Sequence, residues 1–493
     1  MKRFVKIITM ISSVLMAASC FGIDENDYKE LAPIDFNEVS SVIDVDLGQE
    51  LVYDKLQVTS DKPVEFQWAY GPKKISSSGN EYDMDSMEII SSDPAIRYVF
   101  RKLGQYVLRL RVDNGESIEY KYFTLNVNSG LDEGVCILNT DKNGESALTF
   151  IKKRTEDEEA SQEQEIWENV FETINPEQSL VDATDIFMSY HENKGVEYAQ
   201  ILISTKDDRG TVYKLDPKTF ELMAMNRMKE ETGTWCEGFT GHNSSGATYN
   251  YTLIRGADGH TYRYDLFGDF IGERYDATAA GLVTRQYTML YSSNNKYSST
   301  NLKSMLFNET TIFQPGNGKV TALELSGYRV INVASDRDAN KTYVLLQSDS
   351  VPESYTIKYT TGTLGSYKNV KDFTAETLNM DEKSIMVNAK NSSDVYYNYD
   401  NKVWRWGLTS APSESPVAAI QIPSGELITA MATNFMGDFP DGTDESLLYV
   451  ATYNEASDSG NLYVYDILTE SLVKSYKDVC KGRPVKIMYK YRI

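Results

Sequence analysis

Short stretches in which apolar and polar residues alternate dominate the first part of the chain, a pattern typical of half-buried β-strands. Residues 64–68 follow it, and apolar or aromatic residues recur at every second position from Tyr106 to Val112. The Asp-Asn-Gly sequence at 113–115 predicts a hairpin turn, because asparagine and glycine tolerate positive φ. About ninety residues with this pattern, residues 35–129, predict one β-sandwich of the immunoglobulin type.

Residues 130–493 contain a loose repeat made of an apolar strand, a polar turn and a second strand rich in tyrosine. Six units begin near Cys136, Ile201, Thr252, Thr342, Val395 and Leu448. The widest gap between two starts leaves room for one degenerate unit, which we place at 287–313. Seven units with a period of about fifty residues predict a β-propeller of about seven blades.

The last strand of the chain, residues 486–491, is expected to complete a blade that begins near the start of the ring. A series of small β-sandwiches is the alternative interpretation of the same repeat. We favour the propeller, because sandwich domains need units longer than fifty residues. The predicted fold class is therefore all-β, with an N-terminal sandwich followed by a propeller-like domain.

One segment has helical rather than strand periodicity. Its apolar residues share one helical face and are Ile166, Trp167, Val170, Phe171 and Ile174. This spacing predicts one short helix inserted between strands. The acidic run that precedes it, residues 156–165, is expected to be a solvated loop.

The first nineteen residues have the order of a secretory signal. Positive residues at positions 2, 3 and 6 precede an apolar core, and small residues follow at 17–19. The apolar core is too short for a membrane span, and no later run approaches about 18 apolar residues. We therefore expect residues 1–19 to be removed and residues 20–34 to form an acidic linker.

The chain is strongly acidic, with a formal net charge of −23 over 493 residues. Removing residues 1–19 takes away three positive charges and no negative ones, so the mature chain carries −26. Such a charge excludes nucleic acid as an expected partner and disfavours docking on anionic lipid. Besides Cys20, the scattered cysteines Cys136, Cys236 and Cys480 form neither a disulfide framework nor a zinc pattern, so we expect small buried side chains.

No catalytic constellation is apparent. The three histidines, His191, His242 and His260, lack the His-Glu-x-x-His spacing of a zinc protease. The glycine- and serine-containing loop at 241–246 lacks the spacing of a nucleophile elbow. The carboxylates are too numerous for a glycosidase pair to be chosen without distances. We therefore predict no catalytic residue, metal ion or cofactor.

Two acidic loops are candidates for calcium sites. Residues 336–340 have the opening spacing of a calcium loop but lack its later glycine and glutamate, and residues 438–445 form a second acidic loop. Simple solvation is the favoured interpretation of both loops.

Tryptophans are the candidates for ligand contact. Trp404 and Trp406 alternate on one predicted strand and so point to the same face. An exposed pair would form a stacking platform for sugar rings or apolar peptide side chains, whereas a buried pair would belong to the core. Trp235 either lines the mouth of the ring or is buried.

Two resemblances extend these predictions. The sequence from Ala17 to Cys20 resembles the bacterial lipobox, which implies that Cys20 becomes the lipidated first residue of the mature protein. The alternative is a plain secreted protein with a chance cysteine at the cleavage site. Acidic residues at 24, 25 and 27 resemble the signal that exports lipoproteins of gut Bacteroidetes to the outer cell surface.

The chain as a whole resembles the PKD-like family of Bacteroidetes surface lipoproteins. The resemblance is carried by the lipobox, the closing hairpin at 104–112, and the sequences at 213–216 and 259–265. It implies a lipid anchor in the outer membrane, facing the cell exterior, and association with SusC/SusD-like TonB-dependent uptake systems. The function it implies is a non-enzymatic accessory component that binds a glycan or a peptide. A surface hydrolase or lyase, and a purely structural subunit of the transporter complex, are the alternatives.

The lipid anchor gives a direct test. Replacing the lipidated thiol, Cys20→Ser, should release the protein from the membrane fraction, because the remaining chain has no predicted membrane span. Cell fractionation followed by immunoblotting measures this. Retention of the variant in the membrane fraction would contradict the lipoprotein prediction.

Overall fold

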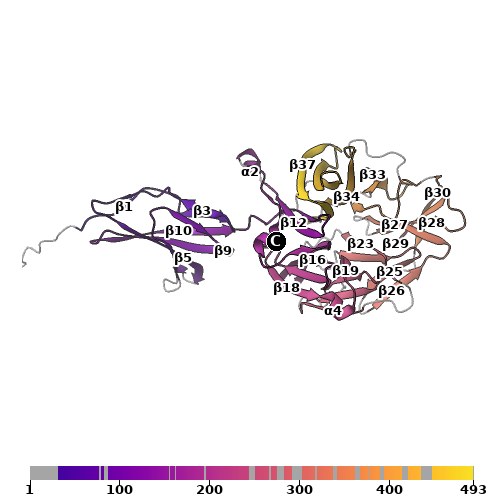
Figure 1. Ribbon diagram of the computed structural model, residues 1–493, viewed down its shortest axis with the longest axis horizontal. Coiled ribbons are helices and arrows are strands. Elements are labelled where there is room, and N and C mark those ends of the chain that lie inside the picture. The colour runs from indigo at the N-terminus through magenta and orange to yellow at the C-terminus, as the bar shows by residue number, and fades with distance from the viewer. Residues whose placement is uncertain are drawn as a thin grey trace, which may run out of the picture. The chain divides into compact units, whose positions relative to one another are not determined.

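The computed structural model is nearly all β, as predicted, and contains only short helices in its described part (Figure 1). It describes residues 31–491 except 77–78, 83–86, 155, 162, 194–195, 244–249, 266–267, 275–281, 291–301, 317–318, 337–340, 361–366, 377, 389–393, 413–419 and 435–446. The chain divides into two compact units, unit 1 (Met1–Ser129) and unit 2 (Gly130–Ile493). None of the described helices is long and apolar enough to cross a membrane.

Unit 1 consists of antiparallel strand pairs with one parallel pairing. Its main sheet has the order β2-β10-β9-β5-β6, with β7 also paired to β5, and smaller sheets pair β3 with β8 and β1 with β4. The strands are β1 (Asp35–Phe36), β2 (Val42–Asp46), β3 (Glu50–Tyr53), β4 (Val58–Thr59), β5 (Glu65–Ser76), β6 (Gly79–Tyr82), β7 (Glu88–Ser91), β8 (Ile96–Val99), β9 (Gly104–Asp113) and β10 (Ile118–Asn128). β10 runs parallel to β2 and antiparallel to β9.

Aromatic packing holds the sheets of unit 1 together. The fully buried Trp68 ring stacks on Phe123 at a centroid distance of 6.0 Å and meets Tyr53 edge-on at 6.4 Å. These rings come from β5, β10 and β3, so one core joins strands of two sheets. The predicted hairpin at 113–115 is confirmed, since it connects β9 to β10, and Gly115 supplies the positive φ of 81°.

Within its described residues, unit 2 contains seven successive antiparallel sheets, which we number 1 to 7. Sheet 1 holds β11 (Gly134–Thr140), β12 (Glu145–Lys152), β13 (Ile166–Trp167), β14 (Leu180–Val181) and β38 (Arg483–Lys490). Sheet 2 holds β15 (Ala183–Asn193), β16 (Val196–Thr205), β17 (Thr211–Leu215) and β18 (Leu222–Arg227), and sheet 3 holds β19 (Cys236–Asn243), β20 (Asn250–Gly256), β21 (Thr261–Asp265) and β22 (Phe270–Arg274).

The remaining four sheets follow the same meander order. Sheet 4 holds β23 (Arg285–Leu290), β24 (Leu302–Phe307), β25 (Thr311–Gly316) and β26 (Lys319–Glu324), and sheet 5 holds β27 (Tyr328–Asp336), β28 (Lys341–Ser348), β29 (Ser354–Thr360) and β30 (Lys368–Thr374). Sheet 6 holds β31 (Met386–Asn388), β32 (Asp394–Tyr399) and β33 (Lys402–Gly407), and sheet 7 holds β34 (Glu426–Thr433), β35 (Leu447–Asn454), β36 (Ser459–Asp466) and β37 (Leu472–Lys481).

The first strands of consecutive sheets contact one another. β15, β19, β23, β27, β31 and β34 meet in this order, and β38 contacts both β34 and β15. In sheet 1, β38 therefore occupies the position that the first strand occupies in each of the other sheets. Apolar clusters fill the spaces between neighbouring sheets, as between sheets 5 and 6 and between sheets 6 and 7.

The predicted return of the last strand is confirmed. β38 pairs antiparallel with β11, with Ile487 opposite Ile137 and Met488 opposite Cys136. Both isoleucines are buried and pack with apolar residues of sheet 7. The pairing joins the two ends of unit 2 in one sheet.

The repeat predicted from sequence corresponds to the central hairpins of the sheets. The predicted start near Cys136 lies in β11, and the other five lie in the second strands β16, β20, β28, β32 and β35. The degenerate unit placed at 287–313 lies in sheet 4, on β23, β24 and β25. The first strands were not recognised, because nearly continuous burial in strands such as β27 hides the alternation that marks a half-buried strand.

Asparagine and aspartate begin many turns between second and third strands. Their side-chain oxygens accept backbone N–H groups two to four residues later, which stabilises the turn without help from other sheets. The residues that do so are Asp141, Asp207, Asp258, Asn308 and Asn454.

The predicted helix is wrong in its extent. Only Val170–Ile174 is helical (α3), and Ile166–Trp167 instead pairs with β12 as strand β13. The acidic run is not simply a solvated loop, because Glu156–Ser161 forms α2, and Glu159 forms an ion pair with Lys474 of sheet 7. Strand pairing and this ion pair depend on residues distant in sequence, so periodicity alone could not reveal them.

The closing pair gives a stability prediction. Ile487→Ala should lower the free energy of unfolding of unit 2 by about 2–4 kcal/mol, because it leaves a cavity in the core shared by sheets 1 and 7. Urea denaturation followed by tryptophan fluorescence measures the loss. The control Leu472→Ala removes a half-exposed side chain of β37 and should change stability by less than about 0.5 kcal/mol. Equal effects of the two substitutions would contradict the closing role of β38.

Candidate functional site

The boundary between sheets 1 and 7, which we call the seam, is where the two ends of unit 2 meet. Besides the β38–β11 pairing, side chains of sheet 1 hold backbone groups of sheet 7. The Asn139 Nδ2 donates to the carbonyl oxygen of Lys481 at 2.6 Å, and the Lys142 ammonium donates to that of Glu455 at 2.9 Å. The seam is thus held by polar contacts as well as by the apolar core.

An ion pair also crosses the seam, through the side chain of Lys481. The Lys481 Nζ lies 2.6 Å from an Asp141 oxygen and 3.3 Å from a Glu145 oxygen. The hydrogen bond from Lys481 holds the pKa of Asp141 below its usual range, and the N–H groups of Asn143 and Glu145 act in the same direction against the effect of burial. The same contact, with Glu145 adding to it, raises the pKa of Lys481. Both groups are therefore charged at neutral pH.

A hollow of about 550 Å³ opens beside these contacts, between sheet 1 and sheet 7. Its volume falls in the range of small-molecule sites. Sheet 1 and the segment before α3 contribute four lining residues, and sheet 7 with the turns beside it contributes seven. The lining residues are Asn139, Ala147, Glu168, Asn169, Ser457, Asp458, Ser459, Asp478, Val479, Cys480 and Lys481. We call this hollow the seam pocket.

Hydrogen bonds fix the carboxylates of the sheet 7 wall. The Ser459 hydroxyl donates to Asp478 at 2.5 Å, and the Tyr453 hydroxyl donates to Asp458 at 2.7 Å. The bond to Asp458, together with burial, raises the pKa of Tyr453 to about 12, so this phenol stays protonated. Each carboxylate is thus anchored through one oxygen by a neutral donor.

The backbone at this wall is held in an uncommon conformation. Asp458 and Asp478 have φ values of 50° and 49°, in the left-handed region that most residues avoid. Gly460 packs so closely that an added Cβ would lie 2.5 Å from the Cys480 sulfur. A side chain at position 460 would push into Cys480 and disturb the pocket wall.

Cys480 itself is not a nucleophile. Its side chain is buried, and burial raises the pKa of its thiol to about 12. Because only the thiolate is strongly nucleophilic, the thiol is unreactive at neutral pH. With no histidine in the lining, the pocket offers no arrangement for nucleophilic catalysis through sulfur.

A second polar cluster lies on sheet 7, outside the seam pocket. The buried Glu426 carboxylate accepts hydrogen bonds from Thr452 at 2.5 Å, Tyr463 at 2.8 Å and Lys477 at 2.9 Å. Burial acts to raise the pKa of Glu426. The three donors act to lower it and outweigh burial, so the pKa of Glu426 lies below its usual range. The cluster joins all four strands of sheet 7 and is satisfied within the protein, so it stabilises the sheet.

The tryptophan candidates do not form a stacking platform. Trp404 and Trp406 do share a face, but both are buried in the core between sheets 5 and 6. Their indole N–H groups donate to the carbonyl oxygens of Tyr399 at 3.0 Å and Ser410 at 2.8 Å. The platform interpretation is therefore wrong, because the neighbouring sheet covers the face on which both rings lie.

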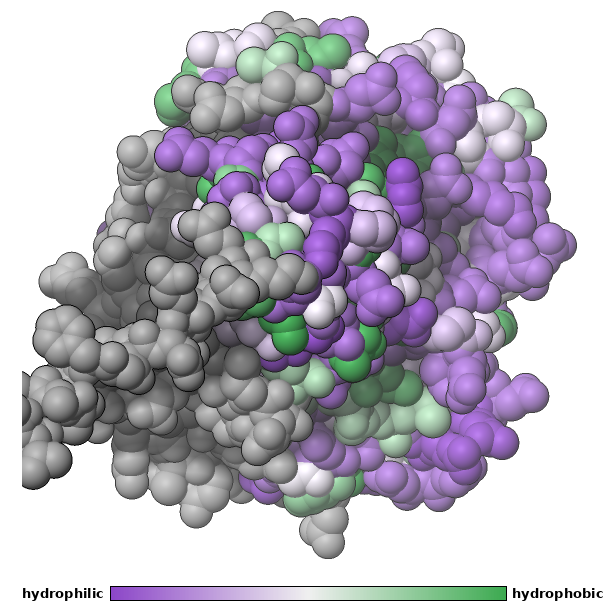
Figure 2. Space-filling model, turned by 90° about the vertical axis from the view of Figure 1, so that its left-hand side faces the viewer, coloured by the Kyte–Doolittle hydropathy of each residue, from purple (hydrophilic) through white to green (hydrophobic). Residues whose placement is uncertain are grey.

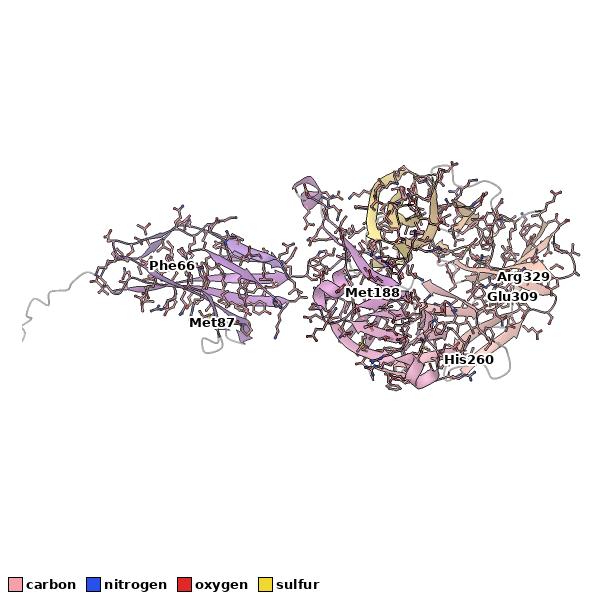
Figure 3. All side chains as sticks on the ribbon, in the orientation of Figure 1. Phe66, Met87, Met188, His260, Glu309 and Arg329 are labelled. Atoms are coloured by element: carbon pink, nitrogen blue, oxygen red, sulfur yellow. The ribbon has the colours of Figure 1, made fainter. Side chains whose placement is uncertain are left out.

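Trp235 is half-buried and lies outside the seam pocket. Its indole N–H donates to Glu237 at 2.9 Å, and the Lys229 ammonium lies 5.2 Å from its ring centroid. His260 lies in the turn after β20, at the periphery of unit 2 in Figure 3, and contacts Arg274 at 2.7 Å. Neither residue lines the seam pocket.

Other sequence candidates lie outside the described part. These are Cys20, the side chains of His191 and His242, residues 337–340 of the first acidic loop, and the whole second acidic loop at 438–445. Among the described residues, no group of three or more histidine, cysteine, aspartate or glutamate side chains could hold a metal ion.

Sequence reasoning did not find the seam pocket. Its lining residues come from two segments separated by about three hundred positions, and each segment alone is a polar turn or strand end. The only available signal was the predicted return of the last strand, which implies a junction between the first and last units.

No family model matches the chain, and no curated protein is detectably similar to it. Among solved structures, a quinoprotein alcohol dehydrogenase-like protein from Bacteroides thetaiotaomicron is similar, with a TM-score of 0.46 and 14% identity over 94% of this chain and 100% of that chain. The BBS1N–ARL6DN complex gives 0.39 and 14% over 59% and 80%, and the nidogen/laminin complex gives 0.35 and 8% over 59% and 98%. At these TM-scores the similarities are too distant to indicate a function.

The seam ion pair predicts a pH dependence. Asp141→Asn keeps the oxygen that accepts the two turn N–H groups but removes the charge facing Lys481. Because the folded-state pKa of Asp141 is lowered, its stabilisation is present above its unfolded pKa of about 4 and is lost as the pH falls through the folded value. The variant should therefore have a lower Tm than the parent at pH 7, and the difference should shrink as the pH falls below about 4.

Scanning calorimetry at a series of pH values measures this difference. The matched variant Lys481→Met removes the other partner and should show the same loss at pH 7. A Tm difference that is constant from pH 7 to pH 3 would show that the ion pair does not contribute.

Proposed function

We propose that this protein is a non-enzymatic, lipid-anchored glycan-binding component on the outer surface of the cell, associated with a SusC/SusD-like uptake complex. In this proposal unit 1 is an immunoglobulin/PKD-like sandwich that acts as a spacer, and unit 2 is a seven-bladed β-propeller that carries the ligand site. The observation that carries the binding role is the seam pocket, most of whose lining residues are polar.

The propeller is supported by the order of the strands. Seven antiparallel sheets follow one another in the described part of unit 2, their first strands contact in sequence, and the last strand completes sheet 1. Closure by a strand from the opposite end of the chain is how a ring of blades avoids two open edges. The immunoglobulin/PKD-like assignment of unit 1 rests on the sequence resemblance and on its antiparallel, aromatic-centred core.

A glycan fits the lining better than a peptide. Carboxylates, amides and hydroxyls make up most of the wall, and the apolar contribution is limited to Ala147, Val479 and Cys480. Sugar hydroxyl groups donate well to fixed carboxylates, whereas an apolar peptide side chain would leave these carboxylates without a donor. The volume of about 550 Å³ suits one or two sugar residues rather than a long chain.

A hydrolase or lyase is the second candidate, favoured by the three carboxylates of Glu168, Asp458 and Asp478 around one pocket. Both candidates predict that substituting the carboxylates weakens binding of the same glycan. They differ in turnover, since an enzyme would cleave a glycan that a binding component would release unchanged.

Isosteric variants test the site. Asp478→Asn and Asp458→Asn keep the oxygens that accept from Ser459 and Tyr453 but remove the charge. Each should weaken glycan binding about tenfold, because hydrogen bonds to charged groups contribute more than neutral ones. A glycan array identifies the ligand, and isothermal titration calorimetry measures the affinity.

The control is Asp349→Asn, an exposed aspartate in the turn after β28, which should bind as the parent does. Unchanged affinity in both pocket variants would place the site elsewhere. Loss of substrate cleavage in either variant, with products detected for the parent, would establish the hydrolase or lyase instead.

The partner is tested in the native membrane. Affinity purification of the intact tagged lipoprotein, followed by mass spectrometry, should recover a TonB-dependent transporter and its SusD-like partner. Recovery of the lipoprotein alone would contradict association with an uptake complex.

A further inference from the structure

The donor groups in the seam pocket are largely engaged within the protein. The Ser459 hydroxyl donates to Asp478, so the Ser457 hydroxyl must donate to Ser459 across their 2.7 Å contact. The amide groups of Asn139 and Asn169 each use one of their two N–H donors, to Lys481 O at 2.6 Å and to a Glu172 oxygen at 2.8 Å. What the wall offers to a ligand is therefore mainly acceptors.

Acceptor oxygens, in contrast, remain available. In the described part of the chain, Asp458 and Asp478 each accept a side-chain hydrogen bond through one carboxylate oxygen only. The Glu168 side chain has no hydrogen bond or ion pair within the described residues, and only its backbone carbonyl is engaged, by Thr149 at 3.0 Å. A ligand in this pocket must supply hydrogen atoms.

The charge of the lining also disfavours an anionic ligand. The lining contains three carboxylates and one cation, Lys481. The ammonium of Lys481 forms its ion pairs with Asp141 and Glu145, which are not lining residues. The lining therefore presents uncompensated negative charge. An anionic sugar would meet both a lack of donors and a like charge.

We propose that the seam pocket binds the protonated amine of a cationic amino sugar, with its ring hydroxyls as further donors, and rejects uronic acids and sulfated sugars. This inference rests on the proposed glycan-binding function and specifies its ligand class. The ammonium supplies three donors and a positive charge to carboxylates that are already oriented by neutral neighbours. A single N-acetyl group would remove the charge and two of the donors.

The experiment compares four probes on the intact mature protein by isothermal titration calorimetry at about pH 5.5. The probes are a glucosamine tetramer, an N-acetylglucosamine tetramer, a galacturonate tetramer and tetralysine. The glucosamine tetramer should bind at least about tenfold more tightly than its acetylated form, and the galacturonate tetramer should not bind measurably. Asp478→Asn and Asp458→Asn should each reduce the preference, and 0.5 M salt should reduce it in the parent.

The outcomes separate this inference from the function on which it rests. Equal binding of the acetylated and free-amine tetramers, with both weakened in Asp478→Asn, would leave glycan binding standing and overturn the amino-sugar assignment. Tighter binding of tetralysine would overturn it in favour of a basic peptide. Binding of the galacturonate tetramer would overturn it as well, and absence of binding by all three glycans here and on the array would overturn both proposals.

Discussion

The pairing of β38 with β11 is the interaction on which unit 2 depends. Residues 483–490 form an edge strand of a sheet whose other strands lie between Gly134 and Val181, far earlier in the chain. Without it, β11 would present an open edge, and apolar residues that pack in the same cluster as Ile487, such as Ile137 and Leu462, would face water. Each of the other sheets is a local meander, so the one long-range pairing decides whether the set of sheets closes.

The seam pocket is a consequence of this closure. Its two walls belong to the first and last sheets, which are held together by the strand pairing, by Asn139 and by the Asp141–Lys481 ion pair. A ligand that bridges the walls would bind only the closed form and would stabilise it by mass action. The α2 segment adds to the same junction, since Glu159 pairs with Lys474 and Gln164 accepts from Tyr476 at 3.2 Å.

Charge has two separate roles in the molecule. Over the whole chain the net charge is strongly negative. The coloured part of the face in Figure 2 is largely hydrophilic, with apolar residues in small groups. At particular positions it is compensated and structural, as in the buried Glu426 with its three donors. In the seam pocket, Asp458 and Asp478 are oriented by hydroxyl donors but not neutralised by a cation, and this difference from Glu426 is what makes them candidates for ligand contact.

Local sequence determined much of this fold. Alternating residues predicted the hairpin of β9 and β10, and the repeat of about fifty residues, with its polar turns, predicted the central hairpins of the sheets. These features follow from short-range physics, since alternation reports a half-buried face and a side-chain oxygen caps its own turn. The return of the final strand to the start of the ring was also predicted from the sequence.

Tertiary structure decided what local pattern could not express. The alternation that placed Trp404 and Trp406 on one face was compatible with an exposed stacking platform or with a buried core. The neighbouring sheet covers this face, so both rings lie in the core. Ile166 and Trp167 have helical spacing but pair with β12, because an available strand edge outweighs a weak propensity. The seam pocket exists only where residues near 140–169 meet residues near 457–481. A sequence pattern shows which side of a strand is buried, whereas only the assembled sheets show what buries it and what space is left between them.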